Sequence, residues 1–353
     1  MEPVLTRQIT RRNPFQLVSI PWIARVFRYP FDRWASLGQQ ALFGAPNYLT
    51  FLLFQRLSPI RPKGIFKFSF DGQEKRVKFN ALNAQFQALY RKCFAGGYEP
   101  VTSALLDLIC PADGAFYDVG SNWGWFSLLI ASKPGFNGEV HAFEPFASSY
   151  ADLVSVVQQA GLGQRVQCHN AALSDRPGSV VMRLPDHFQS GLAVMEETER
   201  AASGATQMST LDSLGLRPPS VIKIDVEGAE IKVLRGGARL LAAHKPFLVF
   251  ENGRAQETPL RTLEPLYFLR DAGYKLFHAG WLKQIGDMPY LTGDDGDPEP
   301  QEKELLALSE FAPQERFLHH DGMNIFACHA ERMGELEALF QKRRLDPITP
   351  PAT

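Results

Sequence analysis

The sequence is poor in several features that would place it in a particular class. Its 353 residues include only four cysteines, with no Cys-x-x-Cys pair, so neither a disulfide framework nor a cysteine-bound metal is expected. The formal net charge is −1, which gives the chain as a whole no attraction to nucleic acid or to an anionic membrane. No apolar run approaches the roughly 20 residues that span a bilayer, and no signal-peptide core follows the early arginines. These absences predict a cytoplasmic protein without a nucleic-acid partner or a transmembrane segment.

The N-terminal part differs from the rest in composition. Residues 1–60 hold seven arginines and ten aromatic residues but only two acids. Residues 65–79 alternate apolar and polar side chains around Asp71-Gly72, a pattern typical of a β-hairpin. We expect residues 1–84 to form an extension that packs its aromatics on the core, or that contacts a partner, the substrate or a membrane surface.

From about residue 98 onward, strand-like and helix-like segments alternate. This pattern predicts an α/β fold with a parallel, doubly wound sheet. Helices are expected at 124–132, 148–161, 229–244 and 260–273. Strands are expected at 114–120, 138–145, 165–173, 220–228, 245–253, 274–281 and 323–329, with an added hairpin near 178–185. Residues 286–304 contain seven acids and one lysine, which favours a mobile acidic insertion.

The turn after the first of these strands indicates a ligand site. Gly120 and Gly124 follow the strand in the order D-V-G-S-N-W-G, where a dinucleotide fold would have G-x-G-x-x-G. A glycine turn before a helix lets a ligand approach the backbone. Asp118 would repel a pyrophosphate and would suit the positive groups of S-adenosylmethionine. Glu144, at the end of the second strand, is placed to accept the hydroxyls of a ribose.

Several motifs together resemble the FkbM-type family of S-adenosylmethionine-dependent methyltransferases. They are "GGYEP", "FYDVGSNWGWFSLL", "VHAFEP", "NAALSD" and, most specifically, "IKIDVEGAEIKVLRGG". The resemblance implies a class I methyltransferase (Rossmann-like) fold, with a mostly parallel seven-stranded sheet after the N-terminal extension. It implies a methyltransferase domain at 85–345, with an FkbM-like core at 98–252 and a tail at 346–353. It further implies methyl transfer, usually to oxygen, with acceptors that include the sugars of glycans.

The resemblance also implies roles for particular residues. It places Asp118, Gly120, Asn122 and Gly124 around the methionine part of the cofactor, with Glu144 on the ribose. Ser121 and Asn122 could equally cap the following helix. Three residues are expected beside the adenine: Asn170, Ala171 and Ala172. Glu99 would close the pocket from the family's entry segment, here "GGYEP" at 96–100.

A second group of polar residues follows the fourth and fifth strands. Asp225 ends the fourth strand, at the edge where open α/β sheets bind ligands, and Glu227 follows it. Lys223, inside that strand, is expected to pair with a neighbouring acid. Asp225 could accept the proton of an acceptor hydroxyl. Alternatively, these strand ends could hold Mg²⁺ through Asp225, Glu251 and Asn252. These three residues resemble the metal-binding triad of catechol-type O-methyltransferases.

Other interpretations remain open at this stage. His187, in a loop after the added hairpin, is a further catalytic candidate. The acceptor could be a hydroxylated small molecule or glycan, or it could be a nitrogen or a carboxyl group. A silent cofactor-binding scaffold and a nicotinamide enzyme are the remaining alternatives. We expect residues 1–60 to select the acceptor or partner and not to build the cofactor site.

Overall fold

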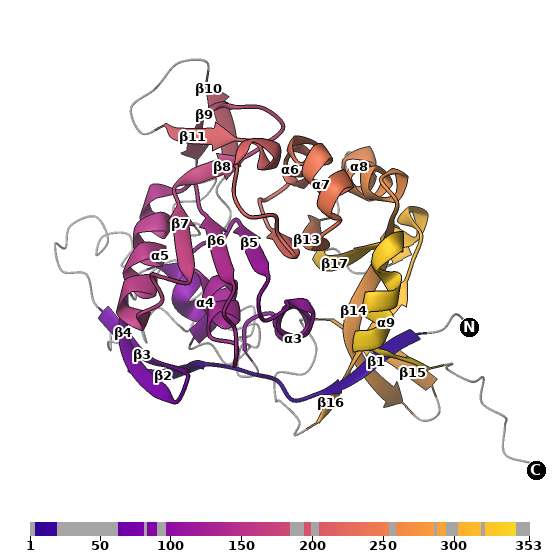
Figure 1. The fold of residues 1–353 in the computed structure, drawn as a ribbon, viewed down its shortest axis with the longest axis horizontal. Coiled ribbons are helices and arrows are strands. Elements are labelled where there is room, and N and C mark those ends of the chain that lie inside the picture. Colours follow the sequence, from indigo (N-terminus) through magenta and orange to yellow (C-terminus); the bar gives the residue numbers. More distant parts are fainter. Residues whose placement is uncertain are drawn as a thin grey trace, which may run out of the picture.

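The computed structural model describes most of the chain (Figure 1). The described residues are 4–19, 63–80, 83–89, 97–183, 194–198, 205–253, 259–285, 288–293, 303–318 and 322–343. The expected tail at 346–353 lies outside these ranges, as does most of the acidic segment 286–304.

The centre of the protein is a parallel sheet whose strands follow the predicted order. It contains β5 (Ala115–Val119), β6 (Glu139–Phe143), β7 (Val166–His169), β12 (Val221–Ile224) and β13 (Phe247–Gly253). In space the order is β7-β6-β5-β12-β13, and all four pairings are parallel. The chain moves outward from β5 to β7 and then returns to the other side of β5 with β12. The sheet is therefore doubly wound, and its switch point lies between β5 and β12.

Helices cover both faces of this sheet because successive strand residues alternate between two cores. The helices are α3 (Pro100–Ile109), α4 (Trp125–Ala131), α5 (Ala147–Ala160), α6 (Glu230–Gly236), α7 (Ala238–His244), α8 (Pro259–Asp271) and α9 (Met333–Leu339). Phe116 packs in the core that includes residues of α3, α4, α5 and α9. Its neighbour Tyr117 packs in the core that includes residues of α6, α7 and α8. The helix expected over 229–244 is divided into α6 and α7 at Gly236-Gly237.

The sheet extends beyond the seven strands that the sequence predicts. In the described residues it has eleven strands. Beyond β13 come β17 (Gly322–His329), β14 (Tyr274–Ile285), β16 (Glu304–Glu310), β1 (Val4–Ile9) and β18 (Gln341–Arg343), and β15 (Met288–Thr292) also pairs with β14. The portion from β7 to β14 corresponds to the expected seven strands, since only β17 runs against the others. The expected count of seven is not confirmed, because four antiparallel strands prolong this portion.

The described strands of the N-terminal part belong to two different sheets. β1 lies inside the large sheet, where it pairs antiparallel with β16 and with β18. Figure 1 shows the chain continuing from β1 along one edge of the molecule to β2 (Phe15–Ser19). β2 joins the expected hairpin, β3 (Lys63–Phe70) and β4 (Gln73–Asn80), in a three-stranded sheet. The expected boundary at residue 84 therefore separates one strand, β1, from the sheet in which it pairs.

Two smaller features complete the fold. A four-stranded sheet contains β10 (Val194–Thr198), β9 (Gly178–Arg183), β11 (Thr206–Ser209) and β8 (Ala171–Leu173). The acidic segment 286–304 contributes β15 and the first residue of β16, Glu304. Glu304 is buried and pairs with Arg11, so the end of this segment is anchored to the N-terminal residues. Within the described residues, the helices are too short or too polar to span a bilayer.

Candidate active site

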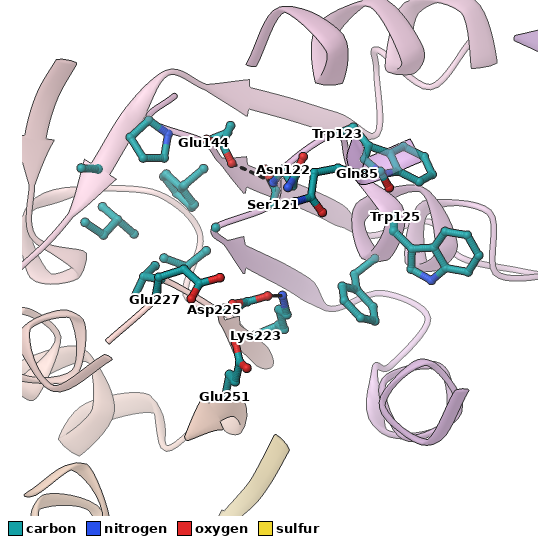
Figure 2. Close-up of a pocket in the computed structure, with 18 of the residues that line it drawn as sticks. Gln85, Ser121, Asn122, Trp123, Trp125, Glu144, Lys223, Asp225, Glu227 and Glu251 are labelled. Carbon is teal, nitrogen blue, oxygen red and sulfur yellow. Dashed lines mark hydrogen bonds and ion pairs between the residues drawn. The ribbon is translucent and has the colours of Figure 1, made fainter. Parts of the chain in front are cut away.

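A pocket of about 280 Å³ opens at the switch point of the sheet, beside the carboxyl ends of β5, β6, β12 and β13. Figure 2 shows that acidic side chains line one part of it and that two tryptophans lie at the other end. Ten of the predicted site residues line this pocket: Glu99, Gly120, Ser121, Asn122, Glu144, Ala171, Ala172, Asp225, Glu227 and Glu251. The structure therefore brings these predicted residues together in one pocket.

Gly120 is required by the packing of two strand ends. Its φ is +80°, a conformation that side chains rarely adopt. A Cβ atom there would lie 1.7 Å from the backbone oxygen of Asp225. Glycine at this position thus brings the turn after β5 against the end of β12, which places both strand ends in one pocket.

The next two residues present unsatisfied polar atoms to the pocket. Ser121 Oγ and Asn122 Oδ1 are buried and have no hydrogen-bond partner within the described residues. Asn122 also has a positive φ of 51°. Buried polar atoms are rarely left unpaired in a folded protein. A bound ligand would supply the missing partners, so this turn is suited to ligand binding.

Glu144 lies at the same end of the pocket. One carboxylate oxygen accepts a hydrogen bond from the backbone N–H of Asn122 at 2.8 Å (Figure 2). The other accepts one from the backbone N–H of Phe146, also at 2.8 Å. Burial raises the pKa of Glu144 to about 7, although these two hydrogen bonds oppose the shift. Each oxygen retains a free lone pair, which a vicinal diol of a ribose could use.

The residues expected beside the adenine divide into two groups. Ala171 and Ala172 line the pocket from β8. Asn170 does not line it. Its side-chain amide donates to the backbone oxygen of Glu144 at 2.9 Å and therefore supports the loop after β6.

Two predicted cofactor residues lie behind the pocket wall. Asp118 is fully buried and is not among the residues that line the pocket. Its Oδ2 atom accepts a hydrogen bond from Ser127 Oγ at 2.6 Å, and its Oδ1 atom has no partner within the described residues. Burial raises its pKa. Gly124 is needed for packing: a Cβ atom there would lie 2.6 Å from Leu153 Cδ1. Both residues position the turn, and their expected place around the methionine part of the cofactor stays a prediction.

The acidic part of the pocket is organised by Lys223. Its Nζ atom lies 2.7 Å from Asp225 Oδ2 and 4.7 Å from the centre of the Phe126 ring. Lys223 is 2% exposed and pairs in register with Asp118 on β5. The buried ammonium therefore lies near the carboxylates of Asp225 and Asp118. The sequence analysis expected Lys223 to pair with one neighbouring acid.

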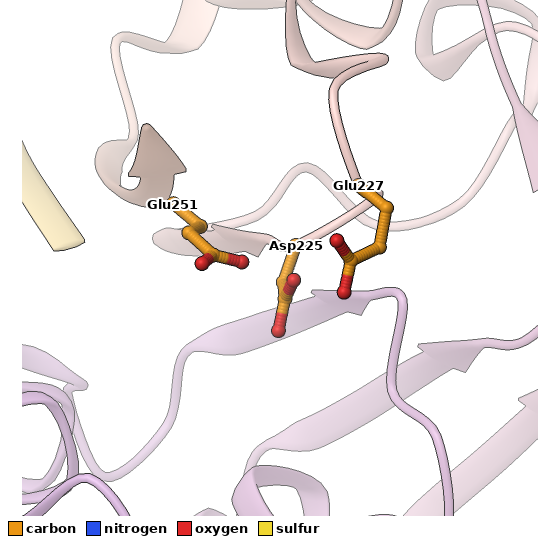
Figure 3. A group of neighbouring side chains, drawn as sticks. All are labelled: Asp225, Glu227 and Glu251. Carbon is orange, nitrogen blue, oxygen red and sulfur yellow. The ribbon is translucent and has the colours of Figure 1, made fainter. Parts of the chain in front are cut away.

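Glu251 reaches the same point from β13 (Figure 3). Burial opposes ionisation of Asp225, but the Lys223 charge and hydrogen bonds from Glu251 and Lys223 hold its pKa below the usual value. The negative charge of Asp225, together with burial, raises the pKa of Glu251 to about 9. At neutral pH the pair is therefore an ionised Asp225 and a protonated Glu251.

Strained backbone marks the rim of the pocket. Glu99 and Glu227 have φ values of 41° and 52°, in a region that non-glycine residues seldom occupy. Both line the pocket, as does Asn122. Such strain is concentrated at binding and catalytic sites. Burial, with the charges of Asp225 and Glu230, raises the pKa of Glu227 to about 7.

Glu99 is held by a residue that the sequence did not reveal. Asn324 on β17 donates from Nδ2 to Glu99 Oε2 at 2.8 Å. It lies opposite Glu251 in the antiparallel register, so both side chains project from the same face of the sheet. Tyr98 also lines the pocket, and the charge of Glu99, followed by burial, raises its pKa.

Two candidates from the sequence are not part of this site. Asn252 follows Glu251 on an extended strand and therefore points to the opposite face. It is buried, donates to the backbone oxygen of Thr262 and accepts from Arg316 Nε at 2.7 Å. The metal triad with Asn252 is therefore wrong. His187 lies outside the described residues.

Aromatic residues of the N-terminal part support the other end of the pocket. Trp123 and Trp125 both line it. Trp125 stacks on Phe15 of β2, with ring centres 4.3 Å apart, and Trp123 stacks on Phe86 at 4.7 Å. The neighbouring Gln85 also lines the pocket. The described residues 4–19 do not line the pocket, but Phe15 of β2 packs behind one of its walls. The expectation that residues 1–60 do not build the cofactor site stays a prediction.

Comparisons with known proteins define the class. Residues 118–276 match the sequence profile described as the methyltransferase FkbM domain. The match covers a little under half of the 353 residues. It confirms the resemblance to the FkbM-type methyltransferases that the motifs indicated.

Individual relatives are more distant. The chain is similar to the hexuronic acid methyltransferase AglP of Haloferax volcanii, with 28% identity over 139 residues, which covers 35% of this chain and 50% of AglP. The chain thus spans about half the length of that curated relative. A crystal structure of the methyltransferase FkbM from Methylobacillus flagellatus is 18% identical, with a TM-score of 0.37, covering 64% of this chain and 53% of the other. The M. jannaschii TYW2 structure with AdoMet is 9% identical, with a TM-score of 0.34, covering 77% and 89%.

Proposed function

We propose that this protein is an S-adenosylmethionine-dependent methyltransferase that methylates a hydroxyl group of a sugar or of another hydroxylated metabolite. The observation that carries the proposal is the ion pair between Lys223 and Asp225 at the switch-point pocket. Lys223 keeps Asp225 ionised, and the pocket lies in the part of the chain that matches the FkbM methyltransferase profile. An ionised carboxylate at this place can remove the proton that an attacking hydroxyl must lose.

The residues of the pocket fit the cofactor. Glu144 offers two carboxylate oxygens to the ribose, and Ala171 and Ala172 leave room for the adenine. Ser121 and Asn122 have unpaired polar atoms for the methionine part. When bound, S-adenosylmethionine supplies an electrophilic methyl group on a positively charged sulfonium. The acidic lining of Glu99, Asp225 and Glu227 suits that positive charge.

The catalytic roles follow from the two protonation states. Asp225 accepts the proton of the acceptor hydroxyl. The protonated Glu251 donates a hydrogen bond to Asp225 and so fixes the direction of the basic oxygen. Glu227, whose pKa is raised to about 7, orients the acceptor by hydrogen bonding. Holding the hydroxyl in line with the methyl group is the main contribution expected from such a pocket.

The acceptor class is supported by the relative AglP, whose name describes a hexuronic acid methyltransferase. A hexuronic acid carries both hydroxyl groups and a carboxylate, so a carboxyl acceptor is the second candidate. A carboxylate is already ionised and needs no base. The buried Lys223–Asp225 pair therefore favours the hydroxyl.

The pocket does not fit Mg²⁺ well. Asp225, Glu227 and Glu251 offer carboxylate oxygens within 4.8 Å of one another. However, the ammonium of Lys223 already pairs with Asp225 at 2.7 Å, so a cation would have to compete with it for this carboxylate. We therefore assign no step to a metal.

Two measurements test this proposal. Titration calorimetry should show binding of S-adenosylhomocysteine and none of NAD. Incubation with methyl-labelled S-adenosylmethionine and a fractionated cell extract should then label a carbohydrate-containing fraction. A hydroxyl acceptor gives an ether that survives mild alkali, whereas a carboxyl acceptor gives an ester that alkali cleaves. Binding of NAD in place of S-adenosylhomocysteine would refute the proposal.

A further inference from the structure

The β3–β4 hairpin has a basic outer face. Its inward residues, among them Phe66, Phe68 and Phe79, are buried, whereas the residues between them project outward. Four of the outward residues are cationic, and we call them the basic face: Lys63, Lys67, Arg76 and Lys78. Among these only Lys67 has an ion-pair partner within the described residues, the largely exposed Glu74 at 2.9 Å.

The positive charges of the basic face repel one another and so destabilise the hairpin. Lys67 lies directly opposite Arg76 in the antiparallel register. Like charges at directly opposed positions destabilise a sheet. An anionic partner would remove this repulsion, which gives the cluster a binding role that the fold does not require.

The hairpin holds the basic face in a fixed orientation. Phe66 packs against Phe79 and Trp123, so the inner side is anchored beside the switch-point pocket. At the turn, Arg165 pairs with Asp71 at 2.9 Å. On the outer side, Ile65 lies opposite Lys78, so an apolar side chain is placed among the cations.

The segment between β2 and β3 is also rich in cationic residues. β2 ends at Ser19 and β3 begins at Lys63, so residues 20–62 leave and re-enter the same three-stranded sheet. These residues include five arginines, no lysine, one acid and nine aromatic residues. Arginines interleaved with Trp, Tyr and Phe are typical of segments that lie at the boundary between a membrane and water.

We propose that the basic face docks on the surface of a bilayer that contains anionic lipids. Clustered lysines and arginines are attracted to the negative potential of such a surface. The aromatic content of the connecting segment favours a lipid surface over a polyanionic polysaccharide or a nucleic acid, since these offer no apolar layer. The inference is independent of the methyl acceptor and goes beyond the proposed function.

The test is sedimentation of the full-length protein with vesicles. The probes are phosphatidylcholine vesicles with and without about one third phosphatidylserine. The variant Lys67→Gln/Arg76→Gln/Lys78→Gln removes three charges of the basic face. The matched control Arg235→Gln/Arg239→Gln/Arg270→Gln removes three exposed arginine charges from α6, α7 and α8. S-adenosylhomocysteine affinity, measured on each protein, verifies the fold.

We expect the wild type and the control to bind phosphatidylserine vesicles, and the basic-face variant to bind at least about tenfold more weakly. Binding of the wild type to these vesicles should also weaken as the salt concentration rises from about 0.05 M to about 0.5 M. This salt test requires no variant. Equal binding by the variant and the control would overturn the proposal. So would the absence of a phosphatidylserine preference in the wild type, or capture by soluble heparin without capture by vesicles.

Discussion

Lys223 Nζ lies 2.7 Å from Asp225 Oδ2, and these two residues of one strand end form the charged centre of the pocket. The Lys223 side chain is 3% exposed and that of Asp225 is 23% exposed, so the pair is largely removed from water. An ion pair in such a place sets the protonation of its neighbours more than it stabilises the fold.

Removal of Lys223 should change the pH dependence of methyl transfer. In Lys223→Gln, Asp225 loses its countercharge, and the acidic limb of the rate profile should move up by about one to three pH units. The free energy of unfolding should fall by about 3–5 kcal/mol, because Asp225 is left buried and unpaired. The first expectation is checked by the pH dependence of the methyl-transfer rate, and the second by denaturant unfolding of the same variant. An unchanged acidic limb would separate Lys223 from the chemistry.

The role of Glu144 predicts a loss of cofactor affinity. Glu144→Ala should weaken S-adenosylhomocysteine binding more than about tenfold, because a charge-assisted contact to the ribose is removed. Glu139→Ala, at the opposite end of the same strand, is the matched control. Calorimetry that gives equal affinities for the two folded variants would reject the ribose assignment.

The contact between β2 and the pocket predicts that an N-terminal substitution acts on the site. Phe15→Ala removes a buried ring that stacks on Trp125 at 4.3 Å. It should cost about 3–5 kcal/mol of stability and weaken S-adenosylhomocysteine binding. Val18→Ala, on the same strand but 39% exposed, should change neither. If folded Phe15→Ala protein bound S-adenosylhomocysteine with unaltered affinity, the contact between Phe15 and Trp125 would serve only the stability of the fold.

The protonated Glu251 predicts a pH dependence of stability. Its pKa is raised from 4.5 to about 9 in the fold, so between these values the native state binds a proton that the unfolded chain has released. Stability from this group is complete below about pH 4.5 and is lost as the pH rises toward 9. In Glu251→Gln, the melting temperature should fall less between about pH 5 and about pH 9 than in the wild type. Glu335→Gln, at an exposed glutamate, should keep the wild-type slope.

Much of the site followed from the sequence, because the acids at strand ends are local features. Gly120, Glu144, Asp225 and Glu251 each sit beside an apolar strand, and the carboxyl ends of parallel strands converge. Asn252 was misassigned because strand side chains alternate, and the sequence did not fix which of two neighbours faces the pocket.

The remaining features depend on contacts between distant parts of the chain. Asn324 reaches Glu99 across 225 positions, and no local pattern indicates such a pair. β1 pairs with β16, which lies about 300 residues later in the chain, and composition alone does not show such a pairing. Trp123 and Trp125 face both the pocket and the aromatics of the N-terminal part, a double role that helical periodicity cannot show.

The central claim is that Asp225 serves as the base of an S-adenosylmethionine-dependent transfer. The most direct test compares wild type, Asp225→Asn and the exposed control Asp271→Asn for transfer of labelled methyl groups to the carbohydrate fraction, with and without a chelator. We predict that the chelator has no effect and that the control keeps full activity. Asp225→Asn should lose roughly 10²–10⁴ in rate while its S-adenosylhomocysteine affinity stays within a few-fold. Transfer by Asp225→Asn at the wild-type rate would contradict the account.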